Sequence, residues 1–216
     1  RWNKGGAETF QKMIKKVLYS KKTSLKTKLC ALMHLLNSTM FLNIFIIAIL
    51  SIPMLYIKSR WSDLSLYFNL SSIFVISTLI FFMCYWQIHK RIYSSGFLSF
   101  IKYAQSFVVF LTLAMGFSFH NSIAVLQGHL GKKTPFVRTP KFNEKSFKKT
   151  LLKNKYINRK ISKNTKVESL LVIYFLFGMY SAFTVGKEGD FGLFPFHLML
   201  FCGFGYVSLR SFIEGK

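Results

Sequence analysis

Long apolar segments that alternate with basic segments constrain this chain more than any other feature. The clearest apolar segment covers about 37–57, and its most hydrophobic stretch is 41–50. A helix needs ~20 apolar residues to cross a bilayer, and four more segments approach that length: 64–86, 97–119, 167–185 and 192–209. In lipid the backbone must satisfy its own hydrogen bonds, which a helix does by itself. The pattern therefore predicts an all-α, multi-span helical membrane domain.

The charge of the chain supports this interpretation. The chain is 51% hydrophobic, yet its formal net charge is +23, from 30 Lys and Arg against 7 Asp and Glu. The loop 131–166 alone holds thirteen Lys and Arg and a single acid, Glu144. Such loops lie on the cytoplasmic side of a membrane. We therefore expect 1–28 and 131–166 inside and the acid-containing joint 186–190 outside. No zinc-finger spacing or RNA-binding motif supports nucleic acid as a partner.

The first 36 residues have the pattern of interfacial amphipathic helices. The chain begins with a polar segment that includes Gly5 and Gly6. After it, apolar residues recur at helical spacing, with lysines on the opposite face. The apolar positions are Phe10, Met13, Ile14, Val17 and Leu18, and later Leu25, Leu29, Leu32, Met33 and Leu36. A basic amphipathic helix of this kind is too polar to span a bilayer and suits the surface of an anionic leaflet.

The predicted sides of the loops do not agree with a single crossing by the third apolar segment. The first two spans and the last two spans each form a helical hairpin that crosses the membrane and returns to the inside. The segment that starts at residue 97 then lies alone between two loops predicted inside. Either 97–130 is bent or re-entrant, with Gly116 and His120 near the bend, or one of the first two spans does not fully cross. The predicted regions are interfacial helices (1–36), spans with a bent third segment (37–130), a basic cytoplasmic loop (131–166) and a helical hairpin (167–210).

Few residues could carry catalytic or metal chemistry. The acids are scattered singly, and no phosphate-binding glycine loop or metal-binding spacing occurs. We predict hydrogen-bonded structural roles for the isolated histidines His120 and His129. The cysteines Cys30, Cys84 and Cys202 lie far apart, which predicts reduced, buried thiols. The sequence thus places no catalytic residue and no metal ligand in this chain.

Two places in the sequence carry side chains whose chemistry suits ligand binding. Arg1-Trp2 joins a cation suited to diphosphate with a flat ring on which a sugar can stack. The alternative is an interfacial Trp beside an Arg that reaches the headgroups. The second place is a proline-stiffened loop, 131–143, whose side chains suit a phosphate-bearing ligand: Phe136, Arg138, Thr139 and Lys141. The alternative is a solvated basic loop that only fixes topology.

Together these places resemble a known family. Arg1-Trp2, followed by Lys4 and Gly5, resembles the end of the Gln-x-x-Arg-Trp motif of processive family 2 glycosyltransferases, the cellulose synthase and cellulose-synthase-like group. Phe136-x-x-Thr139-x-Lys141 resembles the Phe-x-Val-Thr-x-Lys gating loop of that family, with Arg138 at the Val position. The resemblance covers essentially all 216 residues as the C-terminal membrane half.

The resemblance implies a function. A catalytic domain that precedes Arg1 would transfer a sugar, with inversion, from a nucleotide-sugar donor to a growing β-linked glycan. It would hold a divalent metal, Mg or Mn, outside this chain. Arg1 would bind the departing diphosphate and Trp2 would stack on the acceptor sugar. The loop would close on the donor through Phe136, Arg138, Thr139 and Lys141. The implied location is a bacterial inner (plasma) membrane with the basic loops cytoplasmic.

Two other functions are consistent with the residues alone. A small transporter or channel subunit would use the bent third segment as its pore element, and it predicts polar residues clustered on the inner faces of several spans. A non-enzymatic membrane anchor would use the basic loop to bind anionic lipid. The sequence leaves open the sugar, the linkage, the acceptor, the translocation of product and the oligomeric state.

Overall fold

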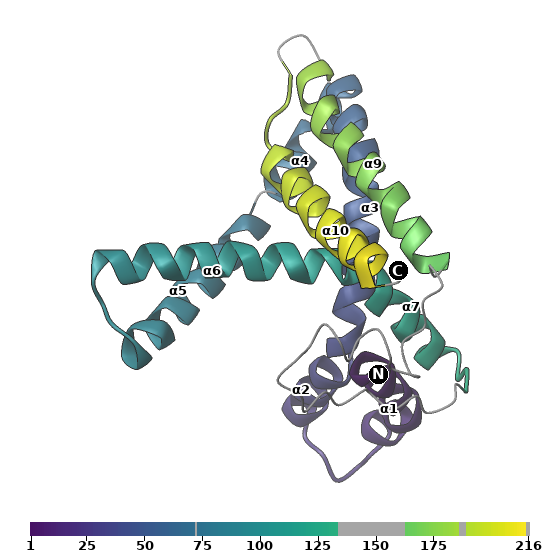
Figure 1. Ribbon diagram of the computed structural model, residues 1–216. Helices are drawn as coiled ribbons and strands as arrows, with labels where there is room; N and C mark the ends of the chain where they lie inside the picture. The colour runs from purple at the N-terminus through teal and green to yellow at the C-terminus, as the bar shows by residue number, and fades with distance from the viewer. Residues whose placement is uncertain (72, 134–162, 186–188, 215–216) are drawn as a thin grey trace. The chain divides into compact units, whose positions relative to one another are not determined.

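The computed structural model describes residues 1–71, 73–133, 163–185 and 189–214 (Figure 1). Every regular element within these ranges is a helix. The elements are α1 (Trp2–Leu18), α2 (Leu25–Leu35), η1 (Asn37–Thr39), α3 (Met40–Arg60), η2 (Ser62–Leu64), α4 (Ser65–Ser71), α5 (Phe74–Ile92), α6 (Phe97–Gly116), α7 (Ser118–His129), α9 (Lys163–Thr184) and α10 (Phe194–Glu214).

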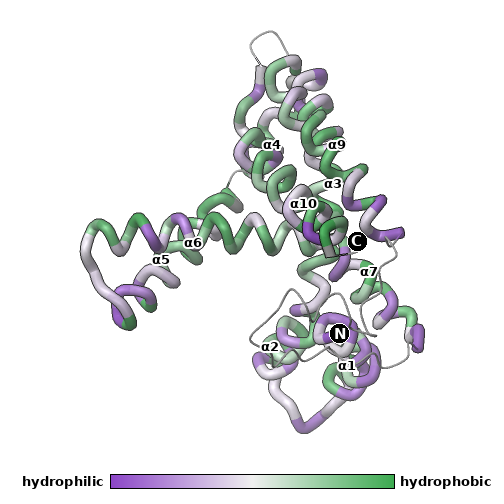
Figure 2. The backbone as a smooth tube through the Cα atoms, viewed as in Figure 1, coloured by the Kyte–Doolittle hydropathy of each residue, from purple (hydrophilic) through white to green (hydrophobic). Residues whose placement is uncertain are grey.

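Five helical segments are long and apolar enough to cross a membrane. They are Asn37–Arg60, Ser65–Ile92, Phe97–Gly116, Lys163–Thr184 and Phe194–Ile213. Figure 2 shows them as mainly hydrophobic tubes. Each corresponds to one of the five apolar segments in the sequence, so the expectation of an all-α integral membrane protein is confirmed. Pro53 lies inside α3, where a spanning helix tolerates it.

The described helices divide into two compact units. Of the described residues, unit 1 comprises 1–45, 118–133, 163–170 and 206–214, and unit 2 comprises 46–71, 73–117, 171–185 and 189–205. The third apolar segment is interrupted at Phe117, where α6 ends and α7 begins. It is therefore two helices, and they belong to different units.

Unit 1 is organised by the packing of α1 against α7 and α2. The expected polar segment before α1 is wrong, because α1 begins at Trp2 and includes Gly5 and Gly6. Packing explains the difference: a Cβ at Gly6 would collide with the side chain of Ser38, so the tertiary contact outweighs the low helix propensity of glycine. Helix α2 starts at Leu25, the first of the later apolar positions, and the Ser24 side chain accepts a hydrogen bond of 3.2 Å from the Thr27 amide as an N-cap.

Unit 2 packs its helices through glycines and aromatic rings. Gly116 of α6 and Gly203 of α10 approach so closely that a Cβ on either would collide with the backbone of the other helix. Such small residues allow close crossing of membrane helices. Phe175 and Phe204 stack at 5.4 Å in the centre of the unit and are fully buried. Rings of α5 and α6 form a second aromatic cluster: Phe82, Trp86, Phe100, Tyr103 and Phe107.

The cysteines differ from their prediction. Cys30, Cys84 and Cys202 are free, but all three are exposed on the chain. Cys84 and Cys202 lie in candidate spans, where the medium around an exposed side chain is lipid. A thiol behaves as a small hydrophobe, so such a position requires no burial within the protein.

Candidate functional site

Helices α1 and α7 meet at a contact that only small residues permit. A Cβ at Gly128 of α7 would lie 2.6 Å from the Lys4 carbonyl oxygen and 2.7 Å from the Ala7 Cβ. Ala7 itself is 1% exposed. The backbone of α7 therefore lies directly against the second turn of α1. This contact fixes where the chain leaves α7, a few residues beyond Gly128.

The chain leaves α7 through a glycine-terminated helix cap. Gly131 has a φ of +65°, which glycine adopts without steric cost. Its amide donates to the Gly128 carbonyl at 3.1 Å, and the Lys132 amide donates to the Gln127 carbonyl at 2.9 Å. These two bonds are the Schellman arrangement. They satisfy the last carbonyls of α7 and set the direction of the loop 131–143 at its start.

The start of this loop is attached to the first turns of α1. The Lys4 ammonium donates to the Lys132 carbonyl at 2.5 Å, a contact between residues 128 positions apart in the sequence. Lys4 lies two residues after Trp2. The structure thus brings the entrance of the predicted ligand-binding loop to the turn of helix that carries Arg1-Trp2. The sequence motifs alone gave no such proximity.

Trp2 presents its indole ring to the surroundings. It belongs to the first turn of α1 and is 95% exposed, and the first turn of α1 contains no acidic residue. An exposed aromatic plane beside cationic groups is available for stacking on a ligand. Four of the predicted site residues lie outside the described ranges: Phe136, Arg138, Thr139 and Lys141.

His129 has the structural role predicted for it. Its Nδ1 lies 3.5 Å from the Gln11 amide nitrogen, and its Nε2 lies 3.3 Å from the Thr39 hydroxyl. Its ring makes an edge contact with Phe10 at 5.4 Å. His129 therefore ties the end of α7 to α1 and η1, which supports the geometry around Lys132.

His120 and Glu168 form a pair that sequence reasoning missed. His120 Nδ1 of α7 lies 3.7 Å from Glu168 Oε1 of α9. The Glu168 side chain is 3% exposed, whereas that of His120 is 64% exposed. The pair joins the helix before the 131–166 loop to the helix after it. The signal was present in the sequence, because a carboxyl at the edge of an apolar span requires a partner.

A second group of polar side chains lies within unit 2. His197 of α10 is fully buried, and its Nε2 lies 2.8 Å from the Ser51 hydroxyl of α3. Its Nδ1 lies against Gly178 and has no hydrogen-bond partner among the described residues. Nearby, the Tyr56 hydroxyl lies 3.0 Å from the Ser181 hydroxyl. A histidine inside a predicted span was the sequence signal for this group.

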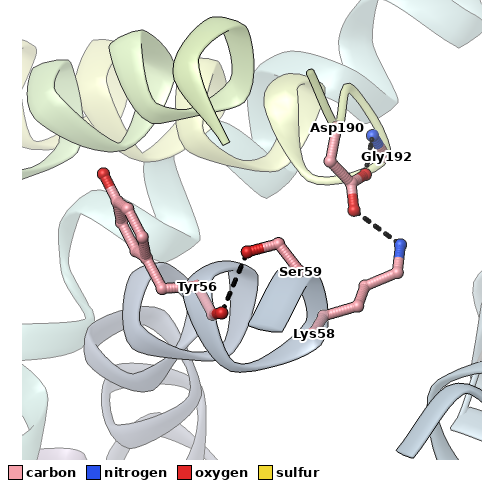
Figure 3. Close-up of polar contacts among 5 residues, drawn as sticks. All are labelled: Tyr56, Lys58, Ser59, Asp190 and Gly192. Carbon is pink, nitrogen blue, oxygen red and sulfur yellow. Dashed lines mark hydrogen bonds and ion pairs between the residues drawn. The ribbon is translucent and has the colours of Figure 1, made fainter. Parts of the chain in front are cut away.

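An ion pair joins the end of α3 to the connection before α10. Lys58 Nζ lies 2.6 Å from Asp190 Oδ2, and the Gly192 amide donates to Asp190 Oδ1 at 3.1 Å (Figure 3). Burial would raise the pKa of Asp190, but hydrogen bonds from Lys58 and Gly192 and the charge of Lys58 outweigh it. Its pKa therefore lies below the ordinary 3.8. Two connections predicted outside thus meet at one end of the spans.

Comparison with known proteins found no matching protein-family model, no similar curated protein and no similar solved structure. Within the described ranges, no group of three His, Cys, Asp or Glu side chains could hold a metal ion. The candidate site consists of cations, an exposed indole and a loop that begins beside them. The fold defines an α-helical integral membrane protein, and the start of α1 carries its candidate site.

Proposed function

We propose that this chain is the membrane part of a glycosyltransferase that transfers sugar from a nucleotide-sugar donor to a growing β-linked glycan. One observation carries the proposal: the Lys4–Lys132 contact places the start of the 131–143 loop beside the Arg1-Trp2 turn. A leaving diphosphate needs cations, and an acceptor sugar needs a flat apolar face. The close packing at Gly128 holds the elements that carry these groups together.

Each residue then has a distinct role. The Arg1 guanidinium pairs with the departing diphosphate and stabilises its developing charge. The exposed face of Trp2 stacks on the acceptor sugar. The loop contacts the donor through Phe136, Arg138, Thr139 and Lys141. A divalent cation, Mg²⁺ or Mn²⁺, supplies further charge neutralisation at the diphosphate, and we place its ligands outside this chain. A bacterial inner membrane with cytoplasmic basic loops belongs to the same proposal.

The test uses the full-length protein in membrane vesicles. Radiolabelled UDP-sugars and GDP-sugars are supplied one at a time, and incorporation into polymer is measured. Trp2→Ala should lower incorporation at least tenfold, equivalent to ~1.4 kcal/mol of transition-state stabilisation, and Trp2→Phe should lower it less. The matched control is Trp61→Ala, a change at another exposed Trp in the connection after α3. Equal activity of Trp2→Ala and wild type, or no incorporation from any donor, would refute the proposal.

A transport function is the second candidate, because one observation favours it. The polar group of Ser51, Tyr56, Ser181 and His197 lies on spans α3, α9 and α10, as a translocation path would require. Most of these groups bond to one another, which also serves helix packing. Solute or ion flux in vesicles that contain the purified chain, reduced by His197→Phe, would favour transport. Wild-type vesicles that show no flux above protein-free vesicles would exclude it.

A further inference from the structure

Helix α2 carries an apolar stripe that the described residues leave uncovered. Leu25, Leu29 and Met33 recur every fourth residue and so share one face of the helix. They are 84%, 57% and 60% exposed. Helix α1 differs, because its Ala7 is buried against α7 and its Phe10 contacts His129. Helix α2 thus exposes a continuous apolar stripe, whereas the apolar positions of α1 are partly covered. We call this apolar face of α2 the α2 stripe.

Three lysines surround the start of this stripe. Lys21 and Lys22 lie in the turn between α1 and α2, and Lys26 lies in the first turn of α2. All three are exposed and have no ion-pair partner in the described part of the chain. The segment 9–36 contains seven lysines and no acid. The charge beside the stripe is therefore positive throughout. The segment 9–36 contains no acid that could balance it.

The connection to α3 places this surface at a membrane. Helix α2 ends at Leu35, and the first membrane-spanning segment begins at Asn37. One residue cannot carry α2 more than a few ångströms from the start of the span, because a residue extends at most ~3.6 Å. A helix so close to the bilayer meets headgroups first and acyl chains next.

We propose that the α2 stripe and Lys21, Lys22 and Lys26 form a docking surface for an anionic lipid leaflet. The stripe enters the boundary between headgroups and acyl chains, roughly 5–10 Å deep. The lysine ammonium groups bind lipid phosphates, each favouring docking about fivefold. This docking is independent of the glycosyltransferase proposal, since it uses none of the residues assigned to sugar or nucleotide.

The charges decide in favour of lipid over another protein chain of the same kind. A second copy packed on the stripe would bring two sets of lysines together without an acid in either segment. Like charges at such a contact repel. An anionic leaflet instead supplies many phosphates, and it is already present beside the first span.

The experiment uses the whole protein in nanodiscs with brominated acyl chains, which quench nearby fluorophores. The three native cysteines are replaced by serine, and Met33→Cys on the stripe is labelled with bimane. The matched control label is His34→Cys, which is exposed on another face of α2. We expect stronger quenching at position 33 than at 34. We also expect it to increase when phosphatidylglycerol replaces part of the phosphatidylcholine, and to fall with added salt.

Charge variants test the lysines. The triple change Lys21→Gln, Lys22→Gln and Lys26→Gln should lower the docked-to-undocked ratio by about tenfold or more. The matched triple at Lys12, Lys15 and Lys16 on α1 removes the same charge and should change the ratio much less. Equal effects of both triples would overturn the assignment to α2. Weak quenching at position 33 in both lipids would place the stripe against protein and also overturn the proposal.

Discussion

The contact between α1 and α7 can be tested by adding a single methyl group. In Gly128→Ala, the new Cβ would lie 2.6 Å from the Lys4 carbonyl oxygen and 2.7 Å from the Ala7 Cβ. The Lys4 carbonyl oxygen belongs to the backbone of α1, and the Ala7 Cβ is bonded directly to that backbone. No side-chain rotation can therefore relieve the contact. The helices must move apart.

The size of the effect follows from this geometry. Ordinary contact starts at 3.4 Å, so α1 must retreat by about 0.8 Å (3.4 − 2.6). Overpacking of this kind costs about 1–3 kcal/mol. Alanine favours a helix over glycine by about 1 kcal/mol, which offsets part of that cost. We expect a net loss of up to about 2 kcal/mol of unfolding free energy, with separation of Lys4 from Lys132.

The assay is reversible unfolding in mixed micelles, followed by circular dichroism, with hydrogen exchange to report on α1. The matched control is Gly5→Ala in α1, where a Cβ meets nothing within 4 Å. This control should gain up to about 1 kcal/mol from helix propensity, so the two variants should shift stability in opposite directions. A Gly128→Ala protein as stable as wild type, with unchanged exchange in α1, would refute the packing argument.

Three further predictions concern unit 2. Gly116→Ala should destabilise the protein by about 1–3 kcal/mol through collision with the α10 backbone, measured by unfolding in micelles. Ser51→Ala removes the described partner of a buried His197 nitrogen and should cost about 1–3 kcal/mol, and Ser51→Thr should restore part of it. The Asp190 pKa is lowered in the folded state. Its ion pair with Lys58 therefore stabilises the folded protein above pH ~4, and this contribution is lost as the pH falls through the folded pKa. Asp190→Asn should remove that pH dependence and at most ~1 kcal/mol, since both side chains are partly exposed.

The helices could be predicted from the sequence because their signals are local. Hydropathy over about twenty residues identified the first span as 37–57, close to the helix Met40–Arg60 with its preceding turn. The start of α1 could not be predicted in this way. Gly5 and Gly6 disfavour a helix locally, and the contact of Gly6 with Ser38 that permits the helix involves a residue 32 positions away (38 − 6).

The candidate site was predicted only in part, for a similar reason. The motif residues Arg1 and Trp2 are visible in the sequence, but the Lys4–Lys132 contact depends on how two helices pack. Glu168 and His197 could have been identified, because an ionisable side chain in or near a span is costly without a partner. Their partners, His120 and Ser51, follow only from the packing of different helices.

Helix α6 has two different faces. Lys102, Gln105 and Ser106 are exposed on one face. Its other face packs on α5 through Phe100 and Tyr103. A helix with one polar and one aromatic face suits the membrane surface or a partial entry better than a full span.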